Sequence, residues 1–207
     1  VSLCNEEQKS YLGCEFFAVD LDNANVPCSV ENGRLEYCDA AAQQYALVLS
    51  NPDPALPAFV SITSGPSFVP APTDECFEPQ PDPNLIVADM IPPKGIKIFE
   101  LPRRDVNGTI KATLAYRIAS NVPITAYQFN PLENVSVFSN DASLLLPTST
   151  AGQRYYVMTR MQTFDDLKSY VTVVGISDEP TEVKVTVTGR TLAGEGIPVL
   201  HAGESFT

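Results

Sequence analysis

Short apolar runs punctuated by proline and glycine constrain the fold of this chain most. The runs are rich in β-branched and aromatic residues, and residues 124–129 alternate strictly, with Ile124, Ala126 and Gln128 on one side. Long helical periodicity is scarce, so the pattern predicts strands bounded by turns. The expected strands are residues 15–21, 45–50, 58–63, 85–90, 95–101, 110–118, 124–129, 155–159, 170–176 and 181–188.

The 18 prolines and 11 glycines in 207 residues favour an all-β protein with Pro-rich loops. Residues 45–63 and 171–188 resemble each other, because each reads as a strand, a turn of Ser, Asn or Asp and Pro, and an alternating strand. Chance similarity between two hairpins is the alternative explanation. The repeat predicts tandem β-sandwich units, Ig-like or jelly-roll-like, over residues 1–120 and 121–207, the second cut short by the end of the chain.

Residues 116–147 read as strand, turn, strand, polar loop and apolar run. Ser120, Asn121 and Pro123 predict the turn. The polar loop over residues 130–140 lies between apolar segments, and loops on a strand scaffold often carry binding residues. We therefore expect an interaction loop, with its candidate contact residues at Asn130, Glu133, Asn134 and Asn140.

The five cysteines all lie in the first 76 residues, at Cys4, Cys14, Cys28, Cys38 and Cys76. No CxxC pair occurs, so the usual zinc and thioredoxin spacings are absent from the sequence. Disulfides are therefore indicated, and they imply an oxidising compartment. Cys28 and Cys38 would close a hairpin loop. The odd cysteine could pair with chain upstream, and Cys4 is the natural candidate for that.

The net charge limits the classes of partner that the chain can bind. The chain carries 13 Lys and Arg against 25 Asp and Glu, a formal charge of −12. Nucleic-acid binding needs a basic face, so we exclude it. No apolar run approaches the roughly 18 residues of a membrane-spanning helix. An acidic surface is typical of a secreted or cell-surface protein, or of one that collects cations.

A calcium site is the one metal site that the sequence suggests. Asp20, Asp22 and Asn25 supply oxygen atoms at alternating positions, which suits a hard cation. The EF-hand pattern is not met, because Gly at the sixth and Glu at the twelfth position are missing. Asx residues also end strands by bonding their own backbone, which is the alternative interpretation.

No catalytic motif is recognisable. His201 is the only histidine, and a Ser-His-Asp device needs such a base. Arg103 beside Asp105 is interpreted as a structural ion pair. Carboxylate pairs for glycoside hydrolysis depend on spatial proximity, so a hydrolase domain or a carbohydrate-binding accessory module stays an alternative. The absence of Trp weakens it. The expectation is a protein that is not an enzyme and needs no cofactor.

Several segments together carry a family resemblance: residues 13–23, 45–52, 99–104, 115–118, 123–131 and 138–147. They resemble the IgGFc-binding protein N-terminal domain family, most closely its bacterial, myxobacterial-type secreted or surface members. The resemblance implies an extracellular, non-enzymatic β-rich module for adhesion, protein binding or cell-surface assembly. Its implied partner is a protein or glycan ligand. Open strand edges add a third alternative, a self-associating surface filament or coat subunit.

Overall fold

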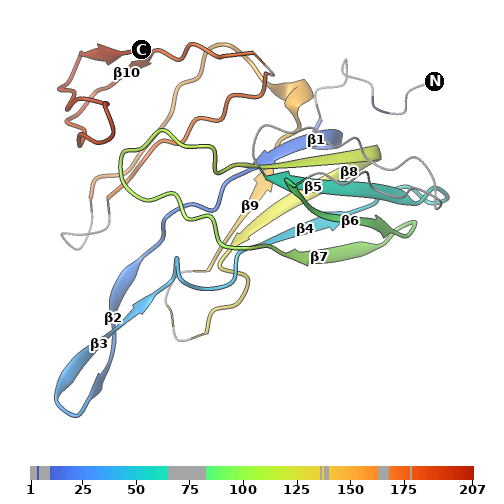
Figure 1. Cartoon of the computed structure of the whole chain (residues 1–207), viewed down its shortest axis with the longest axis horizontal. Helices are drawn as coiled ribbons and strands as arrows, with labels where there is room; N and C mark the ends of the chain where they lie inside the picture. Colours follow the sequence, from blue (N-terminus) through green and yellow to red (C-terminus); the bar gives the residue numbers. More distant parts are fainter. Residues whose placement is uncertain are drawn as a thin grey trace.

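The computed structural model describes residues 4, 10–64, 83–135, 137, 140–162, 168–177 and 179–207. In these residues the protein is all-β with antiparallel sheets, apart from one 3₁₀ turn at Thr148–Thr150 (Figure 1). The strands are β1 (Gly13–Ala18), β2 (Asn25–Glu31), β3 (Arg34–Asp39), β4 (Ala46–Ser50), β5 (Ala58–Ser64), β6 (Leu85–Ile91), β7 (Ile96–Glu100), β8 (Tyr116–Asn130), β9 (Asp141–Leu145), β10 (Val185–Thr186) and β11 (Ser205–Phe206). No helix in the described residues is long and apolar enough to cross a bilayer.

Strand β8 organises the fold. Its first half pairs with β1 on one side and β5 on the other, and its second half pairs with β9 and β4. Strands β6 and β7 extend the two halves beyond β5 and β4. The result is one seven-stranded sheet whose halves, β1-β8-β5-β6 and β9-β8-β4-β7, share the long strand (Figure 1).

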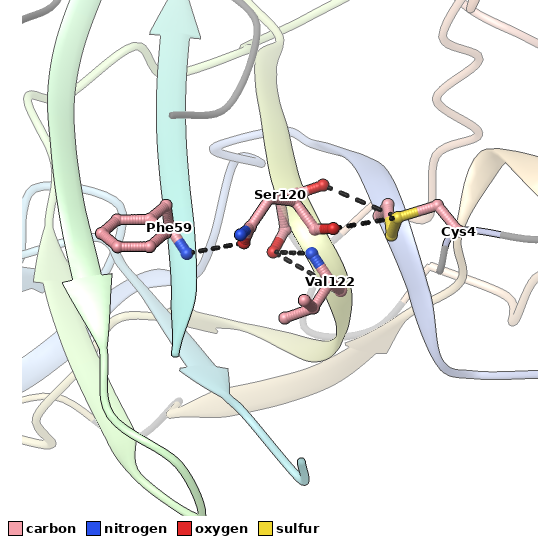
Figure 2. The surroundings of a disulfide bond; sticks show 6 residues. Cys4, Phe59, Ser120 and Val122 are labelled. Atoms are coloured by element: carbon pink, nitrogen blue, oxygen red, sulfur yellow. Dashed lines mark hydrogen bonds between the residues drawn. A yellow bond between two sulfur atoms is a disulfide. The ribbon is translucent and has the colours of Figure 1, made fainter. Parts of the chain in front are cut away.

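The prediction of a turn at residues 120–123 is wrong, because β8 continues through these residues without a break. Pairing with β5 stops at Ser120, and pairing with β4 starts at Thr125. Pro123 has no N–H to donate to a ladder. Side chains fill the gap: Asn121 Oδ1 accepts a hydrogen bond from the backbone N–H of Phe59 at 2.8 Å (Figure 2). The turn-forming residues therefore mark where β8 changes partners.

One core lies along β8. Every second side chain from Tyr116 to Ala126 is buried, and the ring of Tyr116 stacks on that of Tyr45 with 5.7 Å between centroids. The same cluster takes side chains from β1, β4, β5, β6 and β7. The boundary expected at residue 120 falls within β8. The division into units 1–120 and 121–207 stays a prediction.

A disulfide-closed hairpin, β2–β3, projects from the sheet (Figure 1). Asn32 and Gly33 both have positive φ, 51° and 77°, as a two-residue hairpin turn requires. The Cys28–Cys38 disulfide is confirmed.

The expectation that Cys4 pairs with upstream chain is corrected. Cys4 is bonded to Cys14, and its sulfur lies 3.8 Å from the carbonyl oxygen of Ser120, at the point where β8 changes partners (Figure 2). The first disulfide therefore ties Cys4 to β1, beside the middle of β8. Cys76 lies outside the described residues.

Replacing Cys28 and Cys38 together by serine is expected to loosen the hairpin and leave the core intact. An isolated two-stranded hairpin is marginally stable in water, and a disulfide across so short a loop stabilises the closed hairpin against local opening by about 3 kcal/mol. The core does not depend on the hairpin, so global stability should change much less. Trypsin should then cut the exposed Arg34 much faster, while the Tm changes by a few degrees at most. Unchanged cleavage at Arg34, or a collapse of the Tm, would contradict this.

The carboxy-terminal strands are mostly absent. Residues 155–159 and 170–176, expected as strands, form none, and residues 181–188 contribute only β10. Residues 110–118 are extended strand only from Tyr116 onward. The apolar residues in these segments do alternate, but in the described residues no neighbouring strand pairs with them.

Candidate binding surface

The outer face of the half β9-β8-β4-β7 is apolar and exposed. Because alternate residues of β8 enter the core, its other residues, such as Tyr127, point outward. The register places Ile98, Val48, Tyr127 and Leu144 in one row across the strands. The apolar sheet face, as we call it, consists of this row with Ile96 and Leu146 beside it.

The exposure of this face is unusual for the surface of a soluble protein. Ile98 is 55% exposed, Tyr127 39% and Leu144 41%. The local sequence explains why: β7 reads Ile-Lys-Ile-Phe-Glu, so apolar residues occupy both of its faces, with Phe99 in the core and Ile98 outside. Contiguous exposed apolar patches mark interaction sites more often than chance.

An acidic pocket of about 230 Å³ lies near one end of the apolar sheet face. It is lined by Gln43, Gln44, Glu100, Leu132, Glu133 and Val135. Glu100 ends β7, so it continues the outward side of Ile98. Gln44 is fixed, because its Nε2 donates to the carbonyl oxygens of Tyr45 at 2.7 Å and Leu101 at 2.8 Å. Within the described residues neither glutamate forms an ion pair.

The structure separates the expected interaction-loop residues. Asn130 is buried, its Nδ2 donates to the carbonyl of Leu21, and the following Pro131 peptide is cis. Asn140 Nδ2 donates to the carbonyl oxygen of Pro131 at 2.9 Å. These two side chains hold the loop in place. Glu133, in the pocket, and Asn134 face solvent. The binding role of the loop stays a prediction.

The expected calcium ligands lie between the end of β1 and the start of β2. Asp20 is fully buried, with Oδ2 accepting the N–H of Arg104 at 2.9 Å and Oδ1 without a hydrogen-bond partner in the described structure. Asp22 Oδ1 accepts the N–H of Asn23, and Asn25 begins β2. No group of three or more His, Cys, Asp or Glu that could hold a metal occurs among the described residues. The calcium site stays a prediction.

Burial has an electrostatic consequence for Asp20. The pKa of its carboxyl is raised to about 7, chiefly by loss of hydration and also by the nearby Asp105 carboxyl, while the hydrogen bond from the Arg104 N–H opposes the shift. Asp105 also forms the expected ion pair with Arg103. His201, the only histidine, is exposed in the loop before β11. Ionisation of Asp20 therefore makes the stability of the fold depend on pH.

These observations define a class: an all-β, disulfide-containing protein with an exposed apolar sheet face. Residues 141–207, which is 67 of the 207 residues, match the family model described as IgGFc binding protein. The match starts at β9 and supports the family resemblance, although most segments that carry the resemblance precede it. No curated protein and no solved structure matches the chain.

Sequence reasoning missed the apolar sheet face. The one available signal for an exposed apolar face is the sequence of β7, which has apolar residues on both of its faces. Only the register of four strands shows that Ile98, Tyr127 and Leu144 share a row. By contrast, Glu133 was named from the sequence, and the structure places it in the pocket.

Proposed function

We propose that the chain is a non-enzymatic, extracellular protein-binding module, and that the apolar sheet face is its binding surface. The row Ile98–Val48–Tyr127–Leu144 carries this proposal. Two disulfides fit an oxidising compartment, and the matched family is described as a binding protein. Placement on a bacterial cell surface, and a role in adhesion or assembly, belong to the same proposal.

The energetics favour a protein partner. Burying apolar surface stabilises a complex by about 25 cal/mol per Å². Protein interfaces combine an apolar, aromatic centre with a polar rim. Here Tyr127 and Ile98 form the centre, while Glu100 and Glu133 form part of the rim. Such a face offers a protein partner both the apolar area and the charged edge that specific association needs.

A carbohydrate-binding or hydrolase role is the second candidate, and the pocket is what favours it. Glu100 and Glu133 both line this pocket, and hydrolysis of a glycosidic bond uses two carboxyl groups. This candidate makes a different prediction: binding of an oligosaccharide that depends on the two glutamates and not on Ile98.

The Ile98→Asp variant is expected to lose protein binding by at least tenfold. A charge at the centre of an apolar contact must be desolvated without a partner. Binding is measured by biolayer interferometry with the chain immobilised. The analytes are IgG Fc, which the family description names, the chain itself, and a panel of oligosaccharides. Leu35→Asp on the β2–β3 hairpin, an equally exposed apolar site, is the control and should bind as the wild type does.

Three outcomes count against the proposal. One is no binding of either protein analyte at about 100 μM. Another is protein binding that survives Ile98→Asp and is lost in Leu35→Asp. The third is oligosaccharide binding that disappears in Glu100→Gln and Glu133→Gln variants, which would replace the proposal with the carbohydrate-binding alternative.

A further inference from the structure

Residues 154–161 hold the most exposed apolar side chains of the described chain. Tyr156 is 94% exposed and Met158 98%. The segment reads Arg-Tyr-Tyr-Val-Met-Thr-Arg-Met and belongs to no strand of the described structure. An apolar segment without a strand partner is suited to become extended and join an open sheet edge elsewhere.

We infer that the partner of the apolar sheet face is residues 154–161 of a second copy of this chain, docked along β7. The inference rests on the proposed function, because it uses the same surface. The segment's own copy leaves it exposed, so an intramolecular contact does not account for it. The outer edge of β7 is open, since among the described residues this strand pairs only with β4.

Charge complementarity supports a second copy as the occupant. Arg154 and Arg160 flank the apolar residues of the segment, and neither forms an ion pair within the described residues. Glu100 and Glu133 stand at one end of the apolar sheet face. Extended, the segment between the two arginines spans about 20 Å, close to the length of a short strand. An extended segment has Arg154, Tyr156, Met158 and Arg160 on one side. Along β7, one arginine then meets the two glutamates while Tyr156 and Met158 lie beside Ile98 and Ile96.

The geometry of the contact determines the form of assembly. The segment and the face are different surfaces of the chain, so the contact is heterologous and each copy keeps one free surface of each kind. Copies therefore add head to tail. The net charge of −12 makes copies repel at long range. Moderate salt screens this long-range repulsion more than the close contact between arginine and glutamate, so assembly should strengthen at moderate salt.

The test uses sedimentation velocity of the full chain at 5–500 μM, a range chosen to be of the order of typical weak-to-moderate dissociation constants. The wild type should form dimers and longer species as concentration rises. The face variant Ile98→Asp with Tyr127→Asp, and the segment variant Arg154→Glu with Arg160→Glu, should each be monomeric. Leu35→Asp and Arg190→Glu, at exposed sites outside the contact, should assemble as the wild type does.

Mixing the two variants gives the sharpest result. The face variant keeps an intact segment and the segment variant keeps an intact face, so an equimolar mixture should form a dimer and stop there. A further set, Glu100→Arg with Glu133→Arg, should be monomeric alone and should pair with the segment variant through the reversed charges. Thermal unfolding of every variant shows whether a loss of assembly reflects misfolding, and the segment variant changes only exposed side chains.

A wild type that stays monomeric across the concentration range overturns the inference, and so does a mixture of folded variants that forms no dimer. Binding of Fc by a monomeric chain, sensitive to Ile98→Asp, would overturn the second copy as partner while leaving the proposed function standing. Assembly that persists in the face variant would show that the segment docks elsewhere, and would overturn the inference and the use of this face together.

Discussion

Replacing Asn51 by alanine is expected to lower the free energy of unfolding by about 3–5 kcal/mol. Asn51 is fully buried in the connection that follows β4. Its Nδ2 donates to the carbonyl oxygens of Leu56 at 2.8 Å, Ile91 at 3.2 Å and Pro92 at 3.3 Å. One side chain thus joins the β4–β5 connection to the turn between β6 and β7, where both halves of the sheet meet.

Alanine would leave these carbonyl groups without their hydrogen-bond donor. It would also remove the acceptor of the Asp53 N–H, which donates to Asn51 Oδ1 in the wild type. Each buried polar group left unsatisfied costs about 1–3 kcal/mol, and water reaches only some of them. Urea unfolding followed by circular dichroism measures the change. Asn107→Ala, at an exposed position, is the control and should stay within about 0.5 kcal/mol of the wild type. A loss under about 1 kcal/mol for Asn51→Ala would contradict the prediction.

The stability of the protein is expected to fall as pH rises from about 4 to 7, by roughly 4 kcal/mol, because of Asp20. Burial raises the pKa of this carboxyl to about 7 in the folded state. In the unfolded chain the pKa is the ordinary value near 4. Between the two values the folded state binds more protons, so stability decreases with pH there and levels off above 7. Each unit of difference corresponds to about 1.4 kcal/mol.

Asp20→Asn isolates this contribution. Asparagine keeps the acceptor for the Arg104 N–H and cannot ionise. The variant should lose most of the pH dependence between 4 and 7, and it should be more stable than the wild type at pH 8. Asp53 and Asp89 have lowered pKa values, so their contributions to stability change below pH 4. Burial also raises the pKa of Asp22, so the variant should keep a small residual slope just above pH 4. Urea unfolding from pH 4.5 to 8.5 is the measurement, with the exposed Glu36→Gln as control. Equal slopes in variant and wild type would refute the role of Asp20.

Sequence reasoning identified most strands of the sheet, because a sheet with one buried face imposes alternation. β4, β5, β6 and β7 lie within a residue or two of their expected bounds. It failed at residues 120–123, where turn-forming residues sit inside β8. Asn121 satisfies a strand N–H there with its side chain, and no local pattern distinguishes that from a turn. The strand predicted at residues 155–159 is also absent, because alternation makes a segment able to form a strand but does not supply a neighbouring strand to pair with.

The sequence by itself determined that this protein is all-β, acidic and disulfide-bonded, and it indicated the Cys28–Cys38 pair, because composition, alternation and local spacing act over a few residues. Only the tertiary structure decided which side chains meet. Residues 48, 98, 127 and 144 form one row because four strands pair in a particular register. Asp20 is buried beside Asp105 because Leu21 bridges to Val106. Register and burial follow from packing between distant segments, and that packing depends on the whole chain at once.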